Sequence, residues 1–432
     1  MALDMRNRLQ SSLASVCMVL AFLTVATPIA TTAESTVGLA PRQELETPKT
    51  PPGNATPENP ARDAARGEKE TPGATASIGA RRVAIGDIHG DHHTFRKLLR
   101  NLELIDDRDH WSGGKQHLVQ TGDIVDRGPD SRRSIDLLIR LQKESQRAGG
   151  STTVLLGNHE VMNLIGEMAY VSPGEYAAFA TEETPAMRED RRTRLLTLIA
   201  QGSPLLRSSY YRTLGRHIHA KNFDRRFPRG YFAHRRAFSR KGDIGRWLLK
   251  RGFVKKIDDT LFLHAGISPR YAQMSAGQIN RKLHDELKTF LDAFDELSKR
   301  DVFDPDLGFP ELMSLISSEL RAGGPDPAIA PLFARLYELS RSGLLLASDG
   351  PIWYRGLAQN DEQTFAASVD RILELQQVER IVVGHTQPES LRIEGRFGNS
   401  VILIDTGMNH KSYGGLPSAL IFQPSGSVQV FE

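Results

Sequence analysis

Six short polar motifs hold most of the side chains in this 432-residue chain that could carry out chemistry. Each motif contains a carboxylate, an amide, an imidazole or a guanidinium group. In chain order they are GDIHG from Gly86, GDIVDRG from Gly122, GNHE from Gly157, HAG from His264, WYR from Trp353 and GHT from Gly384. Together they supply enough oxygen and nitrogen ligands for two metal ions, and arginines that can bind a phosphate.

The expected metal ligands form two sets that share one carboxylate. Asp123 follows an apolar run, and its two carboxylate oxygens can bridge two cations. Mixed oxygen and nitrogen ligation favours Mn, Fe, Zn or Co over Ca, which prefers oxygen alone. Two such ions about 3.5 to 4 Å apart can lower the pKa of a bridging water and clamp a phosphoryl group. The expected ligands are Asp87, His89 and Asp123 for one ion, and Asp123, Asn158, His264 and His385 for the other.

The predicted nucleophile is therefore a metal-bound hydroxide and not a side chain. His159 directly follows Asn158, and as an imidazolium it can protonate the leaving oxygen. Asp126 is the expected partner that orients this imidazole and raises its pKa. Arg127 and Arg355 offer permanently charged forks for the phosphate oxygens. Arg127, Arg355 and Asn158 make up the expected substrate-binding set.

Short apolar, β-prone runs lie directly before five of the motifs, which predicts that strand ends position them. Stretches with helical spacing lie between the first runs, and this alternation implies a layered α/β core. The last two expected strands are separated by Pro424-Ser425-Gly426 and form a plausible hairpin. The expected strands cover residues 83–85, 118–119, 154–156, 261–263, 381–383, 401–404, 419–422 and 428–431.

Two long segments, about 161–252 and 272–348, interrupt this core and are mainly helical in character. The second has apolar residues at helical spacing from Ile279 to Leu297. Such a pattern more often packs on a core than binds a ligand. We interpret both segments as insertions that cap the sheet and shape the cleft.

The N-terminal part of the chain differs in composition from the rest. Arg6 and Arg8 precede an apolar stretch that ends in small residues, which predicts a secretory signal peptide over residues 1–33. The apolar run is shorter than the ~20 residues of a spanning helix, so we expect no stable membrane span after cleavage. Residues 34–80 are rich in Pro, Thr and Glu and predict a disordered linker. The catalytic domain is expected at 81–432, in a secreted or periplasmic bacterial protein.

The cysteine count and the net charge narrow the possible chemistry further. Cys17, the only cysteine, lies in the predicted leader, so the mature protein can use neither disulfides nor thiolate ligands. The net charge of the chain is +3, and it contains no long run of Lys and Arg. This composition gives no reason to expect a nucleic-acid partner.

The ordered motifs resemble those of the phosphoprotein phosphatase branch of the calcineurin-like metallophosphoesterases, whose pattern is GDxHG, GDxVDRG, GNHE, H(G/A)G and GH. The chain is also similar to the bacterial Shewanella-like phosphatases, and the likeness covers about residues 81–432. It rests on GNHEVMNLIG from Gly157, YVSPGEY from Tyr170, GPIWYRG from Gly350, DTGM from Asp405 and YGG from Tyr413.

This resemblance implies a β-sandwich flanked by helices, an α/β/β/α arrangement, and the same ligand, acid and arginine roles as above. It also implies hydrolysis of a phosphomonoester on a phosphorylated protein or peptide, at Ser/Thr or Tyr. Asn163, Tyr170 and Tyr413 could line the cleft, although packing is the commoner role for such tyrosines. Glu160 is expected to support the metal ligands or their loop.

Two other functions fit the same residues. Related bimetal sites attack phosphoanhydrides, so the protein could hydrolyse a nucleotide such as a dinucleoside polyphosphate. Mononucleotide products would distinguish that activity from phosphate release. A secreted binding module that has lost catalysis is the third possibility, and the complete set of ligands, acid and arginines argues against it.

Overall fold

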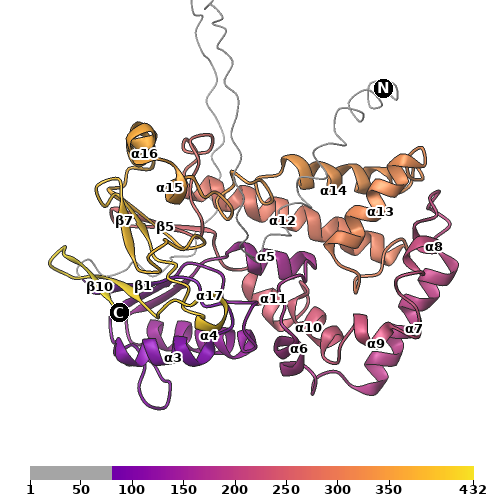
Figure 1. The fold of residues 1–432 in the computed structure, drawn as a ribbon, viewed down its shortest axis with the longest axis horizontal. Coiled ribbons are helices and arrows are strands. Elements are labelled where there is room, and N and C mark those ends of the chain that lie inside the picture. The colour runs from indigo at the N-terminus through magenta and orange to yellow at the C-terminus, as the bar shows by residue number, and fades with distance from the viewer. Residues whose placement is uncertain (1–79) are drawn as a thin grey trace, which may run out of the picture. The chain divides into compact units, whose positions relative to one another are not determined.

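The computed structural model describes residues 80–432. The predicted signal peptide, and the predicted linker apart from Ala80, lie outside the described residues. The described part contains two five-stranded sheets with helices packed around them (Figure 1). This arrangement confirms the helix-flanked β-sandwich expected from the sequence.

The first sheet has the strand order β10-β9-β1-β2-β3. Strands β1, β2 and β3 are parallel, whereas β9 is antiparallel to both β1 and β10, so β9 and β10 form the expected hairpin. The strands are β1 (Arg82–Ile85), β2 (His117–Gln120), β3 (Ser151–Val154), β9 (Ala419–Phe422) and β10 (Val428–Phe431).

The second sheet has the order β4-β5-β6-β8-β7. Its three central strands β5, β6 and β8 are parallel, and the edge strands β4 and β7 are antiparallel to their neighbours. The strands are β4 (Val254–Ile257), β5 (Thr260–Leu263), β6 (Arg380–Val383), β7 (Glu394–Arg396) and β8 (Val401–Leu403).

Alternate residues of the strands face the two sides of each sheet, as the period of a strand requires. Ala84 of β1 and Phe262 of β5 belong to the apolar cluster between the sheets, where the rings of Phe262 and Phe422 lie 5.9 Å apart. Val83 and Ile85, the neighbours of Ala84, belong to the cluster that includes the helices. Each sheet is therefore buried on both faces, which explains the nearly continuous apolar runs in its central strands.

Helices α3 (His92–Asn101) and α4 (Ser131–Arg147) follow β1 and β2 and lie beneath the first sheet in Figure 1. Asp91 begins α3, because its carboxylate accepts a hydrogen bond from Thr94 N at 3.0 Å. Helices α15 (Gly356–Gln359) and α16 (Glu362–Gln376) lie in the chain between β5 and β6 of the second sheet. Helix α17 (His410–Tyr413) follows β8.

The two segments interpreted as insertions consist of helices and loops. The first contains α5 (Asn158–Ile165), α6 (Pro173–Ala178), α7 (Pro185–Gln201), α8 (Tyr210–Leu214), α9 (Phe223–Arg226), α10 (Tyr231–Phe238) and α11 (Asp243–Leu248). The second contains α12 (Ala276–Lys299), α13 (Phe309–Arg321) and α14 (Ala330–Ser342). Among residues 80–432, no helix has both the length and the apolar character needed to cross a membrane.

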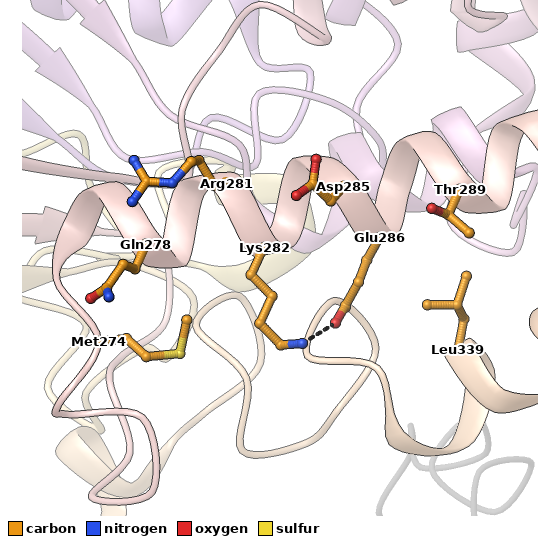
Figure 2. Close-up of a pocket in the computed structure, with 8 residues that line it drawn as sticks. All are labelled: Met274, Gln278, Arg281, Lys282, Asp285, Glu286, Thr289 and Leu339. Carbon is orange, nitrogen blue, oxygen red and sulfur yellow. Dashed lines mark ion pairs between the residues drawn. The ribbon is translucent and has the colours of Figure 1, made fainter. Parts of the chain in front are cut away.

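Helix α12 buries the apolar face predicted from Ile279 to Leu297. Its other face lines an open pocket of about 450 Å³, shown in Figure 2, where Lys282 and Glu286 form an ion pair at 3.0 Å. None of the residues that line this pocket belongs to the six motifs. The pocket is therefore separate from the predicted chemistry.

Two strands were missed and one predicted strand was misplaced. Strands β4 and β7 were not predicted, because both are sheet edges with exposed charges, such as Lys255 and Lys256 in the middle of β4. The third expected strand, 154–156, was placed too late in the chain and overlaps β3 (Ser151–Val154) only at Val154. Leu155 then pairs with Gly252 in an isolated bridge.

Candidate metal centre

The predicted metal-binding residues lie just beyond the carboxyl ends of strands in both sheets. Asp87 and Asp123 follow the parallel strands β1 and β2, and Asn158 begins α5 after β3. His264 and His385 follow β5 and β6, which are parallel neighbours in the second sheet. Since parallel strands end at the same sheet edge, the fold brings residues from distant parts of the chain together.

The loops that carry these residues have an unusual backbone. His89, Asp123, Asp126, Arg127 and His385 all have positive φ angles, between 48° and 71°. Non-glycine residues avoid this region because it costs roughly 1–2 kcal/mol per residue. The packing around these positions must therefore fix five strained residues, a pattern that occurs at functional sites.

Glycine permits the close approach of the strand ends. A Cβ atom at Gly157 would lie 2.2 Å from Asp123 Oδ1, and one at Gly384 would lie 2.3 Å from Asp87 Oδ1. Any side chain at these two positions would push a carboxylate out of place. The glycines of the GNHE and GHT motifs are thus required by the packing of the carboxylates.

Asp123 lies at the centre of the cluster. Its Oδ2 is 3.3 Å from His264 Nε2 and 3.7 Å from His89 Nε2. Two groups of ligand atoms, each within 4.8 Å of one another, share this residue: His89, Asp123 and His159 form one, and Asp123, His264 and His385 form the other. One shared carboxylate between two ligand groups is the arrangement that a dinuclear centre needs.

The orientation of His264 fits a cation. Its Nδ1 lies 3.0 Å from Thr121 O, and because a carbonyl only accepts, Nδ1 must carry the proton. Nε2 lies 3.0 Å from Asn158 Oδ1 and 3.3 Å from Asp123 Oδ2. A neutral ring with its proton on Nδ1 would present the Nε2 lone pair to these two oxygens, and a metal ion among the three atoms would remove their mutual repulsion.

His89 has the same orientation on the other side of Asp123. Its Nδ1 donates to Val125 O at 3.1 Å, which leaves Nε2 facing Asp87 Oδ2 at 3.8 Å. Burial lowers the pKa of His89 to about 3, so this ring is neutral and its lone pair is free. Burial, followed by the charges of His264 and Arg355, also lowers the pKa of His385 well below its ordinary value.

Asp87 is crowded by other carboxylates. Burial, then repulsion from Asp405 and Asp123, raises its pKa well above the ordinary value. The backbone N–H of His385 donates to both Asp87 oxygens at 3.2 Å, and this opposes the shift. A buried group of carboxylates with so few donors fits a bound cation.

Glu160 holds the loop after β2 against the start of α5. Its carboxylate accepts hydrogen bonds at 2.8 Å from the backbone N–H groups of Asp123, Ile124 and Gly157. Burial and the charge of Asp123 raise the pKa of Glu160 to about 7, against the effect of these donors. Glu160 therefore contacts the backbone of the loop and not a ligand side chain.

His159 and Asp126 form a buried pair. His159 Nδ1 lies 2.6 Å from Asp126 Oδ2, and Asn163 Nδ2 donates to Asp126 Oδ1 at 2.9 Å. Burial opposes the charged form of His159, but attraction to Asp123 and the hydrogen bond to Asp126 outweigh it and raise its pKa. Asn163 is fully buried, so it positions Asp126 and does not line a cleft as expected.

The two arginines lie on different sides of the cluster, and both are exposed. Arg127 stacks over the ring of Tyr170, with its Cζ 4.1 Å from the ring centroid, and lies 5.8 Å from that of Tyr413. Arg355 donates from Nη1 to His385 O and to Thr386 Oγ1, both at 2.9 Å. Each guanidinium is thus held beside one part of the metal-binding set.

The tyrosines contact the predicted catalytic and metal-binding imidazoles. The Tyr170 ring lies 5.0 Å from that of His159, and the Tyr413 ring lies 5.3 Å from that of His89. Both tyrosines are half-buried. Each tyrosine therefore packs against an imidazole of the cluster and is also partly exposed to solvent.

Two nearby residues had no role in the prediction. Asn409 Nδ2 donates to His89 O at 2.7 Å, and Asp405 is a buried carboxylate close to Asp87. A signal for Asp405 was present in the sequence, because it follows the apolar run 401–404 as the other acids follow theirs. Nothing local in the sequence distinguishes Asn409.

The chain is similar in sequence or fold to several known phosphatases. Shewanella-like protein phosphatase 2 of Arabidopsis thaliana is 25% identical over 362 residues, 81% of this chain and 77% of that protein. A solved cold-active protein tyrosine phosphatase has a TM-score of 0.51 at 23% identity, covering 82% of this chain and 79% of that one, which shows a shared fold. A symmetrical bis(5'-nucleosyl)-tetraphosphatase of Nitrosomonas europaea is 38% identical over 78 residues, 18% of this chain and 24% of that protein.

The family description that matches this chain is calcineurin-like phosphoesterase, over residues 80–389. That range includes all the predicted metal ligands and both predicted phosphate-binding arginines. Proteins of this family depend on a dinuclear metal centre, and the shared Asp123 offers one. The chain belongs to the calcineurin-like phosphoesterase family and resembles the Shewanella-like phosphatases within it.

Proposed function

We propose that this protein is a bimetal-dependent phosphomonoesterase that acts on phosphorylated proteins or peptides. The observation that carries the proposal is Asp123, shared between two ligand groups beside the His159–Asp126 pair. Membership of the family and similarity to named phosphatases support phosphatase activity. The choice of a protein substrate is supported by the similarity to a Shewanella-like protein phosphatase.

We propose that Asp87, His89 and Asp123 hold one cation. The second would be held by Asp123, Asn158, His264 and His385. The mixture of carboxylate, amide and neutral imidazole ligands suits Mn, Fe, Zn or Co. When bound, the two cations would activate a water for attack and stabilise the charge on the phosphoryl group.

His159 would supply the proton for the leaving oxygen. Asp126 accepts from its Nδ1, which keeps Nε2 directed away from Asp126, towards Asp123 Oδ2 at 3.8 Å. Asn163 in turn fixes the orientation of Asp126. This chain of contacts lets a buried imidazolium donate a proton beside the reacting phosphate.

Arg127, Arg355 and Asn158 would bind the phosphate oxygens. The two guanidinium groups are exposed, and they contact different residues around the metal-binding set, Tyr170 for Arg127 and His385 for Arg355, so both are available to a bound phosphate. Their planar forks suit the tetrahedral phosphate better than a lysine would. Tyr170 limits the freedom of Arg127 by stacking with it.

Phosphate release by the full chain tests this function. The substrates are phosphoserine, phosphothreonine and phosphotyrosine peptides and a dinucleoside tetraphosphate, with Mn²⁺ added or with metal removed. We expect metal-dependent release from peptides that Asp123→Asn abolishes. The matched control is Asp304→Asn, which alters a fully buried carboxylate in the loop between α12 and α13 and should retain activity.

Other products would contradict the proposal in different ways. Mononucleotides from the dinucleotide, without release from any peptide, would favour the nucleotide hydrolase, which the short similarity to a tetraphosphatase also suggests. Binding of a partner by metal-loaded protein without any turnover would favour the non-catalytic module.

We further propose that the protein is exported by cleavage of residues 1–33 and acts in the bacterial periplasm or outside the cell. The sequence pattern of Arg6, Arg8 and the following apolar stretch supports this. Cell fractionation and N-terminal sequencing test it. An intact N-terminus in the cytoplasm would contradict it.

A further inference from the structure

Asp405 is a buried carboxylate beside the metal centre. It follows β8, the parallel neighbour of β6, and the strands β5 and β6 position His264 and His385 in the same way. Asp405 is 1% exposed, and its Oδ1 accepts a hydrogen bond from Gly407 N at 3.0 Å. Within residues 80–432 its Oδ2 is buried and has no hydrogen-bond partner. Each of the three central strands of the second sheet is therefore followed, within two residues, by a residue whose side chain can bind a metal.

The packing of the strand ends brings Asp405 to Asp87. A Cβ atom at Gly86 would lie 2.3 Å from Ile404 O and 3.2 Å from Asp405 Cα, so only glycine allows this approach. Repulsion from the nearby Asp405 carboxylate is one cause of the raised pKa of Asp87. The charge of Asp123 also acts on Asp405. Three carboxylates from two sheets therefore meet in one buried place.

Nearby cations do not balance this group. In the described part of the chain, neither Asp87 nor Asp405 forms an ion pair with a lysine or arginine. Burying negative charge without a positive partner is costly, and such sites persist where a cation binds. The unpartnered Oδ2 of Asp405 thus points to a ligand of positive charge.

We propose that Asp405 is a further carboxylate of the metal centre, which strengthens binding of the cation held by Asp87, His89 and Asp123. This inference rests on the proposed bimetal function. The carboxylate adds a third negative charge on the Asp87 side, where His89 is the only imidazole of the predicted set. Asn158, His264 and His385 are neutral ligands, so the second cation depends less on such an addition.

Mn²⁺ binding to the metal-free full chain, measured by isothermal titration calorimetry, tests the inference. Asp405→Asn preserves the shape of the side chain and removes its charge. We expect it to weaken Mn²⁺ binding at one of the two sites by roughly 10- to 100-fold, the usual effect of losing a supporting group. The control is Asp304→Asn, because Asp304 is also a buried carboxylate but lies outside the metal-binding set, with its Oδ2 3.5 Å from Arg194 Nε.

Thermal unfolding of the metal-free proteins separates this role from a structural one. The amide at position 405 can donate to Asp87, so metal-free Asp405→Asn should unfold at the same temperature as the wild type or higher. A loss of stability larger than that of Asp304→Asn would assign Asp405 a structural role and overturn the inference. If Asp405→Asn does not fold, Asp405→Ser is titrated instead, and weaker Mn²⁺ binding at one site supports the inference.

The remaining outcomes distinguish this inference from the proposed function. Wild-type Mn²⁺ binding at two sites together with unchanged affinity in a folded Asp405 variant would overturn the inference alone. A wild-type chain that binds no divalent cation would overturn the bimetal function and the inference together.

Discussion

The pairing of His159 with Asp126 predicts a kinetic effect that depends on the leaving group. His159→Gln should lower kcat for a phosphoserine peptide by roughly 10²- to 10⁴-fold, because a serine alkoxide leaves only when it is protonated. The loss should be much smaller for p-nitrophenyl phosphate, whose phenolate is stable without a proton. Steady-state kinetics with both substrates measures this difference.

The control for this prediction is His110→Gln. The His110 side chain is exposed and paired with Glu144 at 2.9 Å, outside the metal centre, so kcat should not change. Equal losses on both substrates in His159→Gln would contradict the role of His159 as the general acid and indicate a role in metal binding, which its place in a ligand group also permits.

Stacking of Arg127 on Tyr170 predicts a change in substrate affinity. Tyr170→Leu removes the ring that restrains the guanidinium, and at an exposed site such a contact contributes roughly 0.5–1 kcal/mol. We therefore expect KM for a phosphopeptide to rise about 2- to 5-fold with little change in kcat. Tyr170→Phe keeps the ring and should behave as the wild type. An equal rise in KM for both variants would show that the hydroxyl group is what matters.

At the residue level, the sequence identified the groups that could do chemistry but not all that support them. Asp123 and His264 were predicted because their side chains bind metals and their motifs are distinctive. Asn163 was placed in the cleft because it is polar, whereas it is buried against Asp126. Which way a polar side chain points depends on long-range packing, and no local pattern in the sequence records that.

Among the elements, the central strands could be predicted, whereas two of the edge strands, β4 and β7, could not. The central strands are buried on both faces and so are apolar throughout, as in β5, where all four residues are buried. Strand β7 has no buried residue, and the sequence Glu394–Arg396 gives no apolar pattern. Most of the predicted metal ligands follow central strands, and Asn158 follows the edge strand β3. The site was therefore easier to predict than the two missed edge strands.

The contacts of helix α5 show why the helices of the insertions could be predicted from the sequence but their packing could not. Its start is fixed by Glu160, and its end by Arg235 of α10, whose Nη1 donates to Asn163 O at 3.0 Å. Arg235 Nη2 also donates to Pro305 O at 3.1 Å, in the second insertion. Both insertions therefore meet at the helix that carries His159. Helical periodicity predicted the helices, but such contacts across 70 residues are not encoded locally.

Packing of α6 against α4 predicts an effect of pH on stability. Glu175 of α6 is buried, with Oε2 3.4 Å from Ser131 N at the start of α4, and burial raises its pKa to about 8. The ordinary value is 4.5. The folded state therefore binds more protons than the unfolded state between these two pH values, and the free energy of unfolding falls as pH rises through this range.

Glu175→Gln removes this titration. We expect the variant to lose less stability than the wild type between pH 5 and pH 9, by a few kcal/mol, as measured by urea unfolding at both pH values. Glu189→Gln, which alters an exposed glutamate of α7, should follow the wild type. Parallel pH profiles for Glu175→Gln and the wild type would show that Glu175 is ionised in the folded protein.

Over the whole described molecule, the metal centre is where the ends of strands from both sheets meet. Cations that bind only the folded state stabilise it by about 2.7 kcal/mol when their free concentration is 100 times Kd. Without them, the carboxylates of Asp87 and Asp405 have no lysine or arginine partner in the described part of the chain. We therefore expect a chelator to lower the Tm of the wild type by several degrees, with full recovery on addition of Mn²⁺.

Asp123→Asn should remove most of this dependence, because both ligand groups need the same carboxylate. A variant in only one group, such as His385→Ala, should retain part of the Tm shift through the other cation. If the chelator lowered the Tm of both variants by the same amount, cation binding would not depend on Asp123. Asp123 would then not be the carboxylate that the two metal sites share. If the metal-dependent Tm shift is smaller in His385→Ala and absent only in Asp123→Asn, then both cations stabilise the fold through Asp123. The proposed catalysis depends on the same residue.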